Sequence, residues 1–149
     1  ELAERYPPRA INKLTPTIKD IHIKNFIVES AEKILSVNGI PEIPCSNVLI
    51  ENGKINSKKL IGALNDVDGF TFRNLNIYAE DNKINILDGR NILFDDVTFA
   101  VPHGEILTNI KGDKSQNIII QNGESRTECS MEKPIKVEKL SQVLPKSKK

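Results

Sequence analysis

The sequence predicts an all-β fold, a single-stranded parallel β-helix of about five or six coils. The main observation is a five-residue repeat with the pattern apolar, any residue, apolar, any residue, and then Asn or Asp. Alternation with a period of two is typical of a strand with one buried face. The five repeats begin at Lys19, Ser46, Asp68, Arg90 and Gln116.

Equivalent positions of the repeat hold similar residues. The first apolar position holds Ile21, Val48, Phe70, Ile92 and Ile118, and the second holds Ile23, Ile50, Phe72, Phe94 and Ile120. The residue between them is expected to face outward, so His22 is an outward-facing residue. The polar position recurs every 22 to 27 residues or so, roughly the length of one coil.

The polar position is expected to form a structural Asn ladder. It holds Asn25, Asn52, Asn74, Asp96 and Asn122. Asn tolerates the left-handed conformation at a bend, and its amide can bond to the same residue one coil away.

A second apolar series lies between the repeats and completes each coil. It occupies residues 34–37, 60–64, 84–87 and 106–110. Neither strand can bury its apolar face within its own coil, so stacking must create a continuous core. We expect a hydrophobic cylinder with little aromatic content.

An antiparallel sandwich is the main alternative fold. Asn38-Gly39, Asn52-Gly53 and Asn122-Gly123 are good hairpin signals between apolar runs. Hairpins do not explain why the same residue type returns at the same place in each repeat. The fixed register therefore favours the β-helix.

The chain divides into three parts. Residues 1–16 are expected to form a proline-containing loop or linker that follows missing upstream coils, residues 17–129 the β-helix, and residues 130–149 a C-terminal cap and Lys-rich tail. Within the last part, Val137, Leu140 and Leu144 are spaced to form one apolar helical stripe over the final coil.

No corresponding cap precedes the first repeat. Repeat arrays normally have capping units at both ends, because the terminal core and strand edges need cover. We therefore expect that the chain continues upstream in its natural context, and that in the isolated chain the first coil is exposed and self-associates through its edge.

Composition excludes several partners. The net charge of +1 gives no field that would recruit nucleic acid or an anionic membrane, and no apolar run is long enough to span a membrane. Aromatic residues are 5% and Trp is absent, which disfavours a stand-alone lectin. Cys45 and Cys129 could pair or stay free.

The residues that suggest chemistry have simpler structural interpretations. Asp95-Asp96 is a carboxylate pair, but successive strand residues point to opposite faces. His103 is interpreted as a surface loop residue, and the histidines and cysteines lack metal-ligand spacing. Four further acids are expected in solvated turns rather than in a calcium site: Asp66, Asp68, Glu80 and Asp81. The sequence thus predicts no catalytic residue, metal or cofactor.

Two segments of the chain carry a resemblance to a known family. They are the run Val37-Asn-Gly-Ile-Pro-Glu-Ile-Pro44, followed by residues 46–52, and residues 15–25, Thr-Pro-Thr-Ile-Lys-Asp-Ile-His-Ile-Lys-Asn. The first resembles the Gly-Leu-Pro-Glu-x-Pro segment of bacterial family 28 glycoside hydrolases, the polygalacturonases, and the second resembles the coil that precedes that segment there. The resemblance extends from about Pro7 to Asn122.

This resemblance implies a right-handed parallel β-helix, the pectin-lyase-like solenoid, secreted or periplasmic, from an enzyme that hydrolyses α-galacturonide bonds of pectin with inversion. Such chemistry needs a carboxylic acid and a carboxylate across the sugar ring. The family's Asn-x-Asp, Asp-Asp, Gly-His-Gly and Arg-x-Lys motifs do not occur at corresponding places here. The chain alone is therefore expected to be inactive.

Two functions remain open at this stage. The first is a C-terminal part of a pectin-degrading hydrolase, with pectic polysaccharide as the parent's substrate. The second is a non-catalytic structural or glycan-binding module. Candidate substrate contacts are Arg5, Tyr6 and Arg9, since Arg can grip a carboxylate and Tyr can pack on a sugar; the alternative is that Tyr6 packs on the coil while both arginines are solvated.

Overall fold

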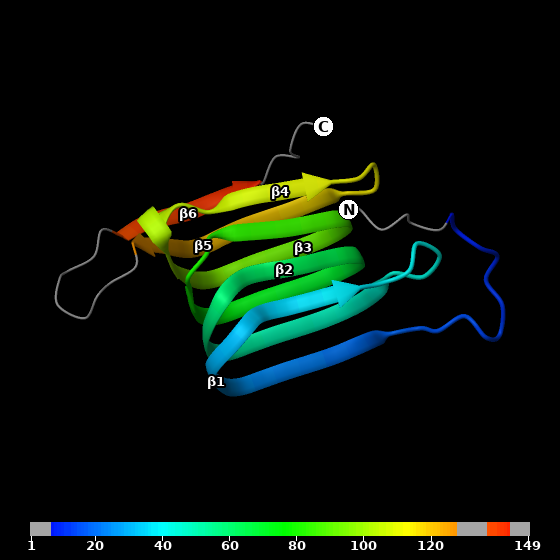
Figure 1. Ribbon diagram of the computed structural model, residues 1–149, viewed down its shortest axis with the longest axis horizontal. Coiled ribbons are helices and arrows are strands. Elements are labelled where there is room, and N and C mark those ends of the chain that lie inside the picture. The colour runs from blue at the N-terminus through cyan, green and yellow to red at the C-terminus, as the bar shows by residue number, and fades with distance from the viewer. Residues whose placement is uncertain (1–6, 128–136, 144–149) are drawn as a thin grey trace.

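The fold is a parallel β-solenoid, as predicted, in which the chain winds round a single core (Figure 1). It has about four turns, fewer than the five or six coils expected from the repeat. The computed structural model describes residues 7–127 and 137–143. Its elements are β1 (Lys19–Asn38), β2 (Cys45–Ala79), β3 (Lys83–Val101), the 3-10 turn η1 (Pro102–Gly104), β4 (Leu107–Lys111), β5 (Gln116–Thr127) and β6 (Val137–Val143). β2 is longer than one coil, because the chain stays extended through the bends between its rungs.

The strand pairing confirms the register predicted from the repeat. β1 pairs with β2, β2 with β3, and β3 with both β4 and β5, in every case parallel. At the first apolar position Ile21 pairs with Val48, and Phe70 pairs with Ile92, which pairs in turn with Ile118. The second apolar series stacks in the same way, so each coil contributes two strands to the wall.

The antiparallel sandwich is excluded for these segments. Asn52-Gly53 lies inside β2 and Asn122-Gly123 lies inside β5, so neither forms a hairpin turn. Asn38 is the last residue of β1, and the loop that follows it leads into the parallel strand β2.

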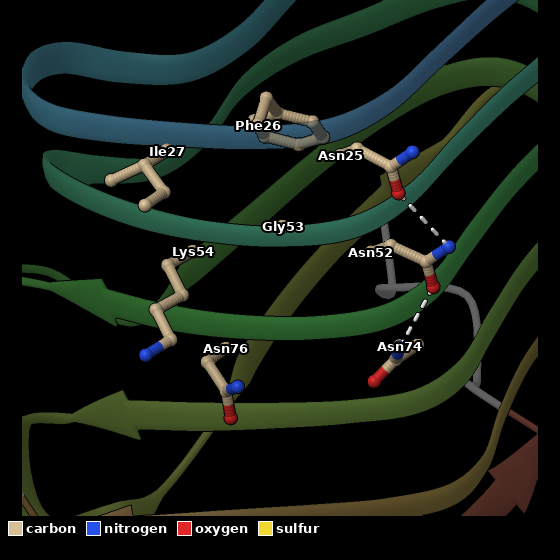
Figure 2. Close-up of a pocket in the computed structure, with 8 residues that line it drawn as sticks. All are labelled: Asn25, Phe26, Ile27, Asn52, Gly53, Lys54, Asn74 and Asn76. Carbon is tan, nitrogen blue, oxygen red and sulfur yellow. Dashed lines mark hydrogen bonds between the residues drawn. The ribbon is translucent and has the colours of Figure 1, made fainter.

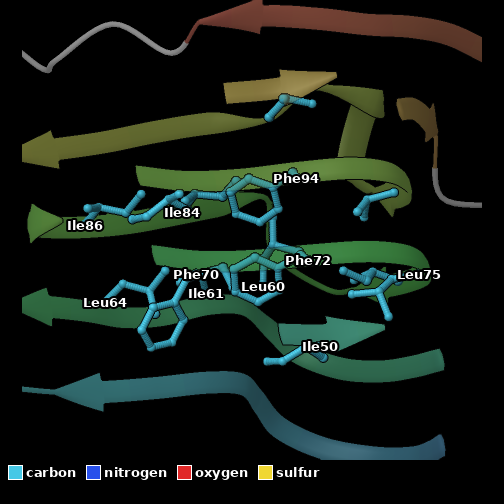
Figure 3. Close-up of a cluster of buried hydrophobic side chains, with 14 of the residues drawn as sticks. Ile50, Leu60, Ile61, Leu64, Phe70, Phe72, Leu75, Ile84, Ile86 and Phe94 are labelled. Atoms are coloured by element: carbon cyan, nitrogen blue, oxygen red, sulfur yellow. The ribbon is translucent and has the colours of Figure 1, made fainter. Parts of the chain in front are cut away.

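The core fills the inside of the coils (Figure 3). It is more aromatic than predicted, because four of the five phenylalanines are fully buried in it: Phe70, Phe72, Phe94 and Phe99. A low overall aromatic content therefore does not describe this core. At about 25 cal/mol per Å² of apolar surface, these large side chains contribute strongly to stability.

The two ends of the stack differ. At the C-terminal end β6 pairs antiparallel with β5 and occupies its outer edge. The helical stripe predicted for Val137 and Leu140 is wrong, because both lie in this strand, and Leu144 lies outside the described residues. A spacing of three is compatible with a helix, but pairing with an open sheet edge satisfies the backbone here instead.

At the other end the first coil is exposed (Figure 1). Ile21 and Ile23 are 38% and 43% exposed, whereas Val48 and Ile50, their equivalents in the next coil, are 6% and 5% exposed. Residues 7–16 form an exposed loop, with one turn near Thr15. The described part of the chain contains no helix that is long and apolar enough to cross a membrane.

Candidate functional site

The Asn ladder forms one corner of the solenoid (Figure 2). Asn25, Asn52 and Asn74 have φ of 57°, 57° and 48°, the left-handed conformation expected for them. The Asn52 amide donates to Asn25 Oδ1 at 3.4 Å, and the Asn74 amide donates to Asn52 Oδ1 at 2.7 Å. Each amide thus links its coil to the preceding one, and all three side chains are exposed.

The ladder changes at Asp96. This residue keeps the left-handed φ of 55°, but a carboxylate has no N–H to donate to Asn74. In the next coil the Asn122 amide donates to Asp95 Oδ1 at 2.9 Å rather than to Asp96. The direct chain of amide bonds therefore covers only the first three ladder positions.

The structure also contains a second ladder, which was not predicted. Each of its residues precedes a residue of the first ladder by five positions and lies where a rung begins. Its left-handed residues are Asp20, Asn47, Gly69, Asn91 and Asn117. Its amides bond across coils from Asn47 to Asp20 at 2.6 Å, from Asn91 to Asp68 at 2.8 Å, and from Asn117 to Asn91 at 2.8 Å. Asn or Asp recurs at this position in four of the five repeats, which could have predicted the ladder, but Gly69 occupies the position in the third repeat.

A shallow, open pocket of about 450 Å³ lies beside the first ladder. It spans three neighbouring coils, as Figure 2 shows. Its lining residues are Asn25, Phe26, Ile27, Asn52, Gly53, Lys54, Asn74 and Asn76. The lining therefore combines four amides, one aromatic ring, one aliphatic side chain and one cation.

Gly53 makes the floor of this pocket. A Cβ at residue 53 would lie 2.5 Å from Phe26 Cζ, so only glycine allows the ring to rest against the second coil. Phe26 pairs with Gly53 in the ladder and is half-buried. The ring is thereby held at the surface as part of the pocket wall.

Lys54 and Asn76 supply polar groups that the fold does not use. Both side chains are exposed. Within residues 7–127 and 137–143, Lys54 has no ion-pair partner and the Asn76 side chain has no hydrogen-bond partner. Their ammonium and amide groups are therefore available to a ligand.

The carboxylate pair is not arranged for acid–base catalysis. Asp95 accepts a hydrogen bond from Asn122 and lies 3.4 Å from Arg73 Nε. The hydrogen bond from Asn122, then those from Gln121 and Arg73, hold the pKa of Asp95 below its usual range. Asp95 therefore stays ionised and is a poor proton donor, while Asp96 is an exposed corner residue.

Both histidines lie at the surface. His22 faces outward, as predicted, and its Nε2 is 2.7 Å from Glu51 Oε1 on the next coil. His103 is exposed in η1 with a φ of 60°. No group of three or more His, Cys, Asp and Glu residues within the described ranges could hold a metal ion.

The solvated-turn interpretation is wrong for two of the four acids. Asp66 is buried within β2 and has a left-handed φ of 50°. Asp68 also lies in β2, where it accepts from Asn91 and is 3.3 Å from Arg90. Asp81 lies outside the strands, but its carboxylate accepts from the Leu60 backbone amide at 2.7 Å. The winding of the chain places these acids beside residues of neighbouring coils. Local turn signals in the sequence do not reveal such contacts.

The predicted substrate contacts do not meet at the pocket. Arg5 and Tyr6 lie outside the described residues. The Arg9 backbone amide donates to Glu42 Oε1 at 2.7 Å, which places it against the loop between β1 and β2. Arg9 is not among the residues that line the pocket.

No family model, curated protein or solved structure matches this chain.

Proposed function

We propose that this solenoid binds an acidic polysaccharide of the pectic type beside the Asn25–Asn74 ladder and does not cleave it. The observation that carries the proposal is the open pocket in which exposed amides, the Phe26 ring and the Lys54 ammonium lie together. A ligand pocket commonly joins apolar surface with a few placed polar groups.

Each group suits one part of a uronide chain. Amide side chains both donate and accept, which matches sugar hydroxyls. The Phe26 ring offers an apolar face to the C–H groups of a sugar, and the Lys54 ammonium can form a charge-assisted hydrogen bond with a uronate carboxylate. The pocket spans three coils and is open, which suits an extended polymer.

The same lining argues against turnover. Inverting hydrolysis needs two carboxyl groups on opposite sides of the bond that breaks. None of the eight lining residues is an acid or a histidine. Binding without cleavage is therefore the activity that this pocket supports.

The binding proposal is tested with polygalacturonate and calorimetry. Lys54→Gln should weaken binding about tenfold through loss of one charge-assisted contact, whereas Lys83→Gln, an exposed lysine at the start of β3, should have no effect. Full methyl esterification of the polymer removes the carboxylates that Lys54 is proposed to contact. The unchanged protein should therefore bind the esterified polymer about as weakly as the Lys54→Gln variant binds polygalacturonate. Equal binding by both variants would contradict the assignment, and release of reducing ends would contradict the lack of turnover.

A second proposal concerns the parent protein. We infer that the chain is the C-terminal β-helix part of a polygalacturonase-like glycoside hydrolase, secreted or periplasmic, whose other coils carry the carboxylates. It is supported by the polygalacturonase-like segments at residues 15–25 and 37–52, and by their order in a parallel solenoid. The test is the reading frame upstream of Glu1. Coils with paired Asp, Gly-His-Gly and Arg-x-Lys motifs are expected there, and a start codon close to Glu1 would count against an enzyme.

A further inference from the structure

The amide bonds of the first ladder end at Asn74, and the residue beside Asn74 in the next coil is Asp96. The register fixes this neighbour, because Leu75, which follows Asn74, pairs with Val97, which follows Asp96. Among the described residues the Asp96 carboxylate has no hydrogen-bond or ion-pair partner, and the residue is exposed. Its negative charge is therefore open to any ligand that lies beside Asn74.

The pocket ends before this carboxylate. Its lining includes Asn74 and Asn76 but neither Asp96 nor Thr98, which pairs with Asn76 in the next coil. One coil further on, Thr98 pairs with Glu124. The surface beside the ladder therefore changes along the solenoid axis, from neutral amides to the carboxylates of Asp96 and Glu124.

The charges on the two sides of the pocket are opposite. Lys54 follows the second repeat and Asp96 belongs to the fourth, so they lie about 10–12 Å apart at the usual strand spacing. A carboxylate bound between them is within about one Debye length of both charges at roughly 0.1 M salt. Asp95 adds little to this field, because Arg73 lies 3.4 Å from it and offsets its charge. An acidic chain is therefore attracted towards Lys54 and repelled from Asp96.

We propose that Asp96 ends the binding track for the acidic polymer, whose chain lies along the solenoid axis and runs from Asn76 towards Asn25. This inference rests on the proposed binding of a pectic polysaccharide and adds which part of it is held. The track binds a short segment or a chain end, and it excludes an acidic chain that continues over the last coils. Asp96 has described coils on both sides, so any coils upstream of Glu1 would leave this end of the track unchanged.

The inference is tested by calorimetry with oligogalacturonates of six and two units on the full 149-residue chain. Asp96→Gly removes the carboxylate, and glycine readily adopts the left-handed φ of 55° found there. The variant should bind hexagalacturonate about fourfold more tightly, the size expected for removing one unit charge about 5 Å away in a water-exposed site. Digalacturonate fits between Lys54 and Asn76, so its affinity should change less than about twofold. Glu105→Gln, which removes an exposed acid outside the pocket lining, should leave both affinities unchanged.

A second neutral variant separates the effect of charge from repair of the ladder. Asp96→Asn can donate to Asn74 and Asp96→Gly cannot, so both should show the gain if the charge is its cause. In 1 M NaCl, where the Debye length is about 3 Å, the gain should disappear. A gain in the Asn variant alone, an equal gain for both oligomer lengths, or a gain that persists in 1 M NaCl would overturn the inference.

The same titrations distinguish failure of this inference from failure of the proposed function. If the unchanged protein binds neither oligomer, the binding proposal fails and this inference fails with it. If the unchanged protein binds hexagalacturonate and neither neutral variant of Asp96 binds it more tightly, this inference alone is overturned. Cooperative unfolding of each variant in urea checks that the proteins compared are folded.

Discussion

Phe72 and Phe94 lie face to face on neighbouring coils, with ring centroids 4.7 Å apart and ring planes 7° from parallel. This separation equals the usual spacing of paired strands, and the two residues are partners in the ladder. Phe99 packs against Phe94 with a tilt of 56°. The rise of the coil therefore sets the aromatic packing at the centre of the core.

Truncation of this stack should be costly. Phe94→Ala removes a fully buried ring that contacts two others, so we expect a loss of about 3–5 kcal/mol in the free energy of unfolding. Leu93→Ala, at the half-buried neighbouring position, should cost only about 1 kcal/mol. Urea unfolding followed by circular dichroism measures both. Similar losses for the two variants would show that the stacked ring adds no more stability than a half-buried side chain does.

The ladders stabilise through conformation as well as hydrogen bonds. Asn91 has a φ of 51°, donates to Asp68 and accepts from Asn117. Asn91→Gly keeps the conformation and loses the bonds, whereas Asn91→Ala loses both. We expect Ala to be less stable than Gly by about 1 kcal/mol, measured by urea unfolding. If Ala were as stable as Gly, the left-handed conformation would not be what selects Asn here.

The core and its register could be predicted from the sequence because apolar alternation and coil length are both periodic. Ile21, Val48 and Ile92 fall at one position by counting alone, and the structure aligns them. The first ladder was equally visible, since the left-handed conformation selects Asn or Asp at each bend.

Other features depend on which neighbour a side chain meets in space. The choice of Asn122 between Asp95 and Asp96 is not encoded in spacing, and neither is the burial of Asp66. The pocket was missed for the same reason. Phe26, Gly53 and Asn76 belong to different coils, and only their stacking brings them to one surface.

Asp95 should make stability depend on pH. Its pKa is below the ordinary value of about 3.9 in the folded state, so the unfolded state binds a proton more readily. The resulting stabilisation is present above about pH 3.9 and is lost as pH falls through the folded-state pKa. Asp95→Asn retains an acceptor for Asn122 but cannot ionise.

We therefore expect Asp95→Asn to be less stable than the unchanged protein at pH 6, with a smaller difference at pH 2.5, below the ordinary pKa of the carboxyl. Unfolding in urea at the two pH values measures this difference. Glu32 and Glu42 also have lowered pKa values, but they contribute equally to both proteins and cancel. A difference in stability that stayed constant with pH would show that the charge of Asp95 has no role.

Cys45 should react slowly in the folded protein. Its thiol is free and buried, and burial raises its pKa, so little thiolate is present and little of it is accessible. In a Cys129→Ser background, iodoacetamide at pH 8 should label Cys45 at least ten times more slowly than in 8 M urea, by an order-of-magnitude estimate from its burial. Mass spectrometry of the modified protein gives both rates. Because Cys45 begins β2, rapid labelling without urea would mean that the second coil opens readily where the loop from β1 joins it.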